Sequence, residues 1–221
     1  MKEIFSVRTM AEVAIFAALG YVLDALAGVY SSSVFVNGGS IGIAMMCVFI
    51  VSYRRGVLPG ILTGLIMGLL DLADGFYAIA GTWYLAFAQV FLDYVICYPL
   101  AGLAGLFRKA FRKADSSDKK MMWIVIGCLV GGSLKFASHY LSGILFWNDP
   151  SGFVWNFTDG YLYSFIYNMA YMLPCIVICT GLMVLIEAKW PSILEDVSSL
   201  SFGKRRTSQK TNKLENKKEG E

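Results

Sequence analysis

Six apolar segments separated by short polar connections make up most of the first 190 residues. A helix that crosses the ~30 Å hydrocarbon layer of a bilayer needs roughly 20 mostly apolar residues, because each residue rises ~1.5 Å. The second and third segments are short and almost continuous. We therefore predict an all-α integral membrane protein, a six-transmembrane-helix bundle with helices near residues 8–28, 41–53, 57–73, 83–107, 121–146 and 160–187.

The positions of the basic residues predict the orientation of this bundle. Eighteen of the 19 Lys and Arg residues lie before the first segment, between the second and third, between the fourth and fifth, or after the sixth. The other connections contain acidic residues such as Asp74 and Asp149 instead. Since short loops rich in Lys and Arg stay on the cytoplasmic side, both termini are expected in the cytoplasm (N-in/C-in). The net charge of +3 is then explained by topology and does not indicate nucleic-acid binding. The expected partner is the lipid bilayer.

Composition changes after residue 190. Residues 1–190 are expected to form one membrane domain, and residues 191–221 a basic, polar cytoplasmic tail without fixed structure, close to an anionic leaflet. The N-terminal apolar run also has features of a secretory signal. Glu12 and Asp24 interrupt that run, which favours a retained first helix.

Small residues at helical spacing predict close contacts between helices. Gly60, Gly64 and Gly68 recur every fourth residue, and Ala14 and Ala18 form a similar pair on the first helix. In lipid, such residues let two helix backbones approach each other. The glycines are expected to face the interior of the bundle, whereas the two alanines fit either an internal contact or a contact with another subunit.

Polar side chains are concentrated in three of the predicted helices, although ionisable groups cost roughly 2.5–3.5 kcal/mol each inside a membrane. Gln89 and Asp93 share one helical face, Lys135 and His139 share another, and Asn168 lies on the last helix. At ~1.5 Å per residue, Asp93, Lys135, His139 and Asn168 lie roughly 10–16 Å below the outer ends of their helices. This common depth predicts a binding pocket in the outer half of the bundle.

Two other interpretations of these residues compete with a pocket. A buried Asp93–Lys135 ion pair could serve only to fix the helix register. Alternatively, an intramembrane enzyme could use His139 and Asp93 as acid and base. The sequence contains no HExxH or Walker A motif, and Cys175 and Cys179 have no third metal ligand nearby. We therefore expect no catalytic residue, no metal site and no cofactor. Because the chain has no Walker A motif, the energy for any active transport must come from partners or an ion gradient.

Several segments resemble one known family. Glu12–Ala18, Tyr53–Val57, Gln89–Tyr94, Lys135–Trp147 and Tyr163–Asn168 are similar to the thiamine-specific substrate-binding (S) component of bacterial energy-coupling-factor (ECF) vitamin transporters. The resemblance implies a multi-pass protein of the bacterial cell membrane that captures thiamine from outside with high affinity. It also implies two kinds of partner, a membrane coupling subunit and two cytoplasmic ATPase subunits.

The resemblance also assigns roles to individual residues. Asp93 would engage the aminopyrimidine of thiamine, although some members carry Glu at this position. Ala14 and Ala18 would contact the coupling subunit. The pocket would further be lined by Tyr94, Lys135, His139, Trp147, Tyr163 and Asn168, with Gln89 and Tyr77 as secondary candidates. The alternatives that stay open are an S component for another vitamin or a thiamine precursor, a stand-alone carrier, and the intramembrane enzyme.

Overall fold

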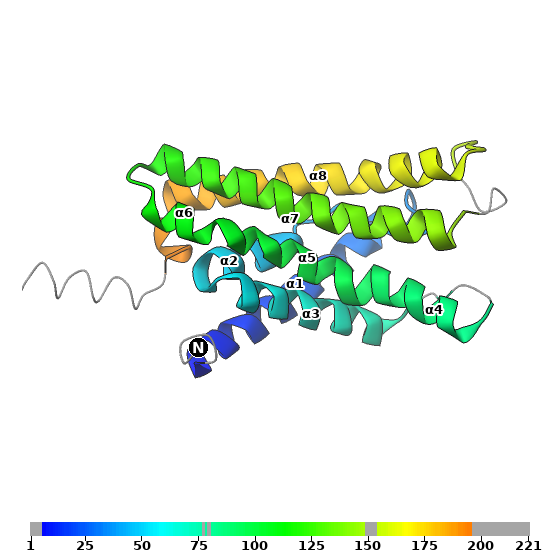
Figure 1. The fold of residues 1–221 in the computed structure, drawn as a ribbon, viewed down its shortest axis with the longest axis horizontal. Helices are drawn as coiled ribbons and strands as arrows, with labels where there is room; N and C mark the ends of the chain where they lie inside the picture. Colours follow the sequence, from blue (N-terminus) through cyan, green and yellow to red (C-terminus); the bar gives the residue numbers. More distant parts are fainter. Residues whose placement is uncertain (1–5, 77, 79–80, 149–153, 196–221) are drawn as a thin grey trace, which may run out of the picture.

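The computed structural model describes residues 6–76, 78, 81–148 and 154–195, and these residues form helices and connections without a strand (Figure 1). The α-helices are α1 (Val7–Ser31), α2 (Met45–Arg55), α3 (Val57–Asp74), α4 (Trp83–Val90), α5 (Cys97–Ala101), α6 (Arg108–Lys113), α7 (Ser117–Phe146) and α8 (Gly160–Lys189). A π-helical turn, η1 (Phe91–Ile96), and two 3-10 helices, η2 (Gly102–Phe107) and η4 (Pro191–Ile193), complete the fold.

Five helical segments in the described part of the chain are long and apolar enough to cross a membrane. They are α1, α3, α7, α8 and the continuous run Trp83–Lys113. The predicted segment 41–53 forms instead the 11-residue α2, which at ~1.5 Å per residue spans only about 17 Å. The described residues therefore contain five candidate transmembrane helices where the sequence predicted six, and the second predicted segment is a short helix.

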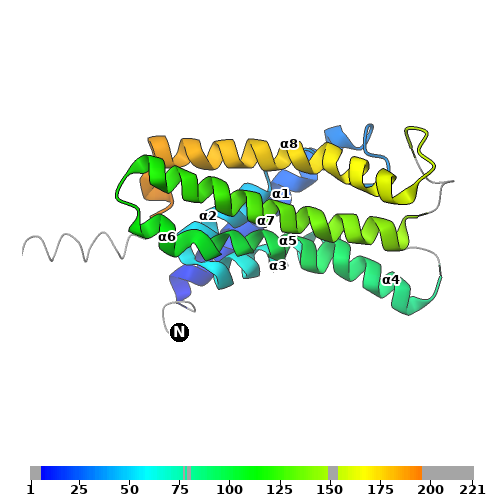
Figure 2. The same ribbon diagram turned by 45° about the horizontal axis from the view of Figure 1, so that its top comes forward.

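The helices pack in a consistent arrangement in both ribbon views (Figures 1 and 2). α7 and α8 lie side by side along most of their length, and α1 crosses the bundle obliquely. α3 contacts α1 and α2, and also packs against the run formed by η1, α5 and η2. The interior between these helices therefore receives side chains from segments that are far apart in sequence.

The predicted glycine contact lies inside the bundle. A Cβ atom on Gly64 would lie 2.4 Å from the carbonyl oxygen of Tyr98, and one on Gly68 would lie 2.0 Å from that of Tyr94. A Cβ atom on Gly60 would lie 3.2 Å from the carbonyl oxygen of Gly102 and nearer still to the Ser52 side chain of α2. These three glycines thus allow α3 to lie directly against the backbone of the neighbouring run, as the sequence predicts.

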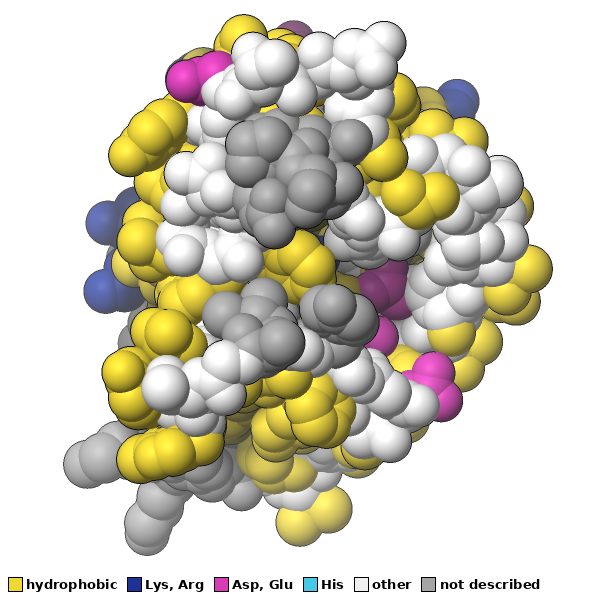
Figure 3. Space-filling view, turned by 90° about the vertical axis from the view of Figure 1, so that its right-hand side faces the viewer, with side chains coloured by type: hydrophobic (Ala, Val, Ile, Leu, Met, Phe, Trp, Pro, Cys, Tyr) yellow, Lys and Arg dark blue, Asp and Glu magenta, His cyan; other side chains and the backbone are white. Residues whose placement is uncertain are grey.

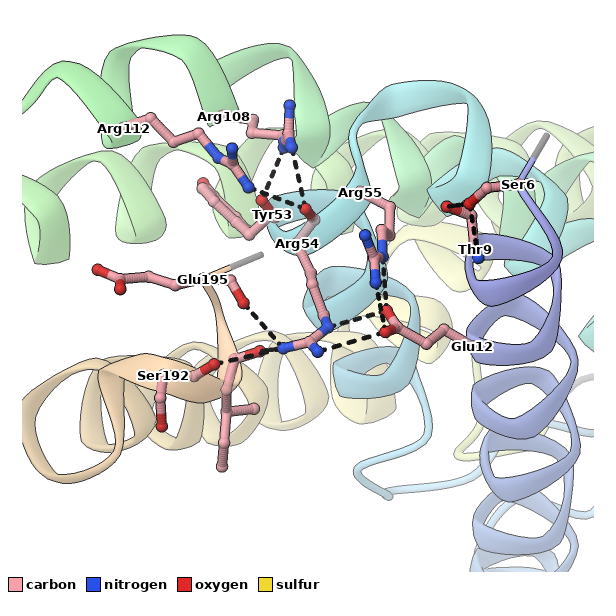
Figure 4. A network of polar contacts seen from close by, with 11 residues as sticks. Ser6, Thr9, Glu12, Tyr53, Arg54, Arg55, Arg108, Arg112, Ser192 and Glu195 are labelled. Carbon is pink, nitrogen blue, oxygen red and sulfur yellow. Dashed lines mark hydrogen bonds and ion pairs between the residues drawn. The ribbon is translucent and has the colours of Figure 1, made fainter. Parts of the chain in front are cut away.

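A network of ion pairs and hydrogen bonds joins several elements at one end of the bundle, which we call the basic end (Figure 4). The Glu12 carboxylate of α1 binds Arg54 Nε at 2.8 Å and Arg55 Nη2 at 2.5 Å. The Arg54 guanidinium also donates to the carbonyl oxygens of Ile193, at 2.7 Å, and Glu195, at 3.0 Å. Arg54 therefore connects α1 to the segment that follows α8.

The packed part of the chain extends beyond the predicted domain boundary at residue 190. Leu194 is fully buried, and Lys120 of α7 binds Glu195 at 3.1 Å. Residues 191–195 thus belong to the bundle. The rest of the predicted tail, residues 196–221, lies outside the described residues.

Candidate ligand-binding site

Asp93 occupies the π-helical turn η1, where the wider turn interrupts the α-helical hydrogen bonding. Gln89 Nε2 donates to Asp93 Oδ2 at 2.7 Å, and His139 Nδ1 of α7 lies 3.7 Å from Asp93 Oδ1. Gln89 is only 1% exposed, whereas the side chains of Asp93 and His139 are each 17% exposed. The buried Gln89 thus fixes one oxygen of the carboxylate, while the Asp93 side chain stays partly exposed, so that a ligand can reach it.

A second set of polar groups comes from α8. The Tyr171 hydroxyl donates to Asn168 Oδ1 at 2.5 Å, and Asn168 Nδ2 donates to the carbonyl of Ser164 at 2.8 Å. The rings of His139 and Tyr171 meet edge to face with centroids 6.2 Å apart. His139 therefore connects the Asp93 group to the Asn168 group.

Tyrosine rings continue this α8 surface toward the connection between α1 and α2. Asn37 Nδ2 donates to the Tyr163 hydroxyl at 2.9 Å, and the Asn37 backbone N–H donates to the Tyr167 hydroxyl at 3.0 Å. The Tyr163 and Tyr167 rings have centroids 5.4 Å apart. The α1–α2 connection is thereby bound to the same α8 surface that carries Asn168.

Lys135 is buried, with 9% of the residue exposed, and its partner differs from the one that an ion-pair interpretation proposes. Its Nζ lies 3.7 Å from the centroid of the Tyr98 ring. The Asp93 carboxylate is instead paired with His139 and Gln89. The structure thus gives Asp93 and Lys135 separate partners.

The other predicted residues are distributed as follows. Tyr94 follows Asp93 on η1, with its carbonyl against α3, and the partly exposed Trp147 ends α7. Tyr77 lies outside the described residues. Ala14 and Ala18 are exposed on the surface of α1, opposite the buried face of that helix.

Several residues near the site were not among the predicted ligands. Tyr98 receives the Lys135 ammonium on its ring, and its hydroxyl donates to Asp24 of α1. Tyr171 and Asn37 bind predicted site residues directly. For Asp24 a signal exists in the sequence, because it is an ionisable residue inside an apolar segment. A tyrosine in an apolar run gives no comparable signal.

The chemical character of the site follows from these groups. It combines a carboxylate, an imidazole, an amide and several phenol rings, and no group of three or more His, Cys, Asp and Glu residues in the described part could hold a metal ion. Figure 3 views the end opposite the basic end and shows acidic side chains inside a hollow. Such a surface suits a planar, cationic ligand that can stack on aromatic rings and accept and donate hydrogen bonds.

Comparisons with known proteins identify the family of this chain. Residues 10–195 match the family described as Thiamine transporter protein (Thia_YuaJ). The chain is 32% identical over 189 residues to the thiamine transporter ThiT of Bacillus subtilis, covering 83% of this chain and 92% of the relative. It is 30% identical over 172 residues to ThiT of Lacticaseibacillus paracasei, covering 76% and 79%.

A solved structure of ThiT from Listeria monocytogenes has the same fold. The two structures superpose with a TM-score of 0.69 at 23% identity, covering 86% of this chain and 98% of the other. The helical fold, the apolar spans and the family match over most of the sequence lead to one conclusion. The chain is a multi-pass membrane protein that belongs to the thiamine transporter protein family.

Proposed function

We propose that this chain binds thiamine and acts as the S component of an ECF-type transporter in a bacterial cell membrane. The observation that carries the proposal is the Asp93–His139 pair, which lies beside Asn168 and Tyr171. A carboxylate backed by Gln89 can accept hydrogen bonds from the amino group of an aminopyrimidine. The surrounding rings can stack on the two heterocycles of thiamine and favour its positive charge.

The remaining expected ligands complete this proposal. Tyr94, Lys135, Trp147 and Tyr163 would line the pocket around Asp93, and Gln89 would hold the carboxylate in place. The acidic hollow at the end opposite the basic end would attract the cation from outside (Figure 3). In this orientation the basic end, with both termini, faces the cytoplasm, as Lys and Arg in short connections favour.

The exposed alanines of α1 support a role in assembly. Ala14 and Ala18 lie on a surface that the other described residues leave uncovered, together with Ile15, which is 64% exposed. Small residues at this spacing let another helix approach closely in lipid. We assign this face to the membrane coupling subunit, which would join the chain to two cytoplasmic ATPases.

A titration of the detergent-purified protein with thiamine tests the substrate. The expected result is saturable quenching of tryptophan fluorescence, since Trp147 would lie at the ligand. The panel should include the separate pyrimidine and thiazole moieties and other vitamins. Saturable binding of another compound in the absence of thiamine binding would refute the substrate assignment.

A second experiment tests the transport mechanism. Thiamine uptake by cells that express this chain should require co-expression of the coupling subunit and both ATPases. Uptake that persists without them would identify a stand-alone carrier. A change in the mass of thiamine after incubation with the purified chain would identify an enzyme.

A further inference from the structure

A second polar cluster lies beside the candidate ligand site. The Tyr98 hydroxyl donates to Asp24 of α1 and lies 3.4 Å from Asp71 Oδ2 of α3. The face of the Tyr98 ring receives the Lys135 ammonium, whose Nζ lies 3.7 Å from the ring centroid. Tyr98 therefore connects residues of α1 and α3 to a residue of α7.

The chemistry of the hydroxyl explains why Tyr98 has a single orientation. A phenol has one hydrogen, so it can donate to only one of the two carboxylates. The shorter contact identifies Asp24 as the acceptor, and Ser40 Oγ donates to the other oxygen of that carboxylate at 3.0 Å. Tyr98 is only 5% exposed, so its ring has little freedom to turn.

The ring in turn determines where the ammonium lies. A buried ammonium is costly without a partner, and a phenol ring attracts it most strongly at the ring face. A hydrogen bond from the phenol to a carboxylate adds electron density to the ring and strengthens this attraction.

The position of the ammonium matters for the ligand site. Lys135 lies one helical turn before His139 on the same face of α7, and His139 is paired with Asp93. The helical run that carries Tyr98 also carries Asp93, and the Cys97 thiol beside Tyr98 donates to the carbonyl oxygen of Asp93 at 2.6 Å. Lys135 thus contacts the same helical run that carries Asp93, and it lies one turn of α7 from the imidazole that is paired with that carboxylate.

We infer that Tyr98 is a positioning residue, held by Asp24, that places the Lys135 ammonium for ligand binding. α1 then contributes to affinity through Asp24, although it supplies none of the predicted ligands. This inference rests on the proposed function, because the ligand in question is thiamine.

A double-mutant cycle on thiamine affinity tests the inference. Tyr98→Leu removes the ring and is expected to raise the Kd by roughly 2- to 30-fold, the range from an exposed to a desolvated cation–π contact. Lys135→Met should raise it at least as much. If Tyr98 acts through Lys135, the double variant should bind no more weakly than Lys135→Met alone. Independent, multiplying effects would overturn the inference.

Variants of Asp24 test the upstream step. Asp24→Leu, which has no acceptor for the phenol hydrogen, should weaken thiamine binding, whereas Asp24→Asn keeps a carbonyl acceptor and should restore most of the affinity. The matched control is Asp74→Leu, since Asp74 is an exposed acidic residue at the same end of α3 as Asp71. Equal losses for Asp24→Leu and Asp74→Leu would indicate a general charge effect and refute the role of Asp24.

The wild-type titration separates this inference from the proposed function. If the wild type binds thiamine and the cycle is additive, only the positioning role fails. If the wild type does not bind thiamine, the proposed function fails. The Tyr98–Lys135 contact is then tested by the same cycle on the melting temperature, where additivity would refute it as well.

Discussion

At the scale of single residues, the candidate site depends on which partner each charged group has. The intramembrane polar residues Asp93, Lys135, His139 and Asn168 could be selected from the sequence, because each is costly in an apolar segment. Which of these residues pair with each other could not be predicted from the sequence. An Asp and a Lys at similar depth predict an ion pair, but the rotation of each helix decides which groups meet.

The Asp93 carboxylate is expected to be more important for ligand binding than any other side chain. Asp93→Asn keeps the shape but removes the charge, and it replaces one acceptor oxygen with a donor group. A lost charge-assisted hydrogen bond costs about 1.5–3 kcal/mol, so the thiamine Kd should rise roughly 10- to 100-fold. Isothermal titration calorimetry measures this change.

Asp93→Glu is the informative companion variant. It keeps the charge and both acceptor oxygens, so it should retain far more affinity than Asp93→Asn. If both variants bind thiamine as well as the wild type does, Asp93 is not a ligand.

At the scale of helices, hydrophobic patterning predicted the long elements well and the irregular ones poorly. Long apolar runs correspond to α1, α3, α7 and α8 within a few residues. The π-helical turn at Phe91–Ile96 had no signature, because a π turn uses the same residue types as an α-helix and depends on tertiary contacts. The predicted segment began at residue 41, before the start of α2, because the apolar residues of the preceding connection resemble those of a helix.

The contact of α3 with the neighbouring run predicts the effect of a larger residue at Gly64. Its Cβ would lie 2.4 Å from a backbone oxygen that cannot move without its helix, so Gly64→Ala should destabilise the protein by about 1–3 kcal/mol. Thermal unfolding in detergent measures this effect. The control is Gly181→Ala on α8, where a Cβ meets no atom within 4 Å and the melting temperature should be unchanged or higher.

The basic end predicts a second stability effect. Glu12→Gln would replace a carboxylate that pairs with the 7% exposed Arg55 side chain by a neutral amide, so a loss of about 1–3 kcal/mol is expected. Asp115→Asn is the control, because Asp115 and Lys119 form an exposed pair that contributes at most about 1 kcal/mol. Equal melting temperatures for both variants would show that the network does not stabilise the fold.

At the scale of the whole molecule, the two ends of the bundle differ in charge. The basic end ties α1 to the α2–α3 turn and to the segment after α8, while the opposite end presents acidic groups in a hollow (Figures 3 and 4). The uncovered face of α1 runs along the side, between these ends. Ligand capture and partner assembly are thus assigned to different surfaces of one molecule.

This separation predicts that assembly can be blocked without loss of ligand binding. Ala14→Leu adds bulk on an exposed face, so thiamine affinity should be unchanged, whereas co-purification with the coupling subunit and thiamine uptake should be lost. Ala188→Leu on α8 is the control, since Ala188 is also exposed. Normal assembly of the Ala14 variant would place the coupling contact elsewhere.

The π-helical turn has a consequence for how this protein can change in evolution. A π turn contains one residue more than the α-helical turn it replaces, and one residue corresponds to about 100° of rotation. Deletion of a single residue from Tyr94–Ile96, which lies between Asp93 and Tyr98, would regularise the helix, but it would rotate Asp93 relative to the Tyr98 backbone that contacts Gly64. Insertions and deletions in this turn are therefore a simple route by which homologous sequences could exchange one ligand-facing side chain for another while the packing of α3 is kept.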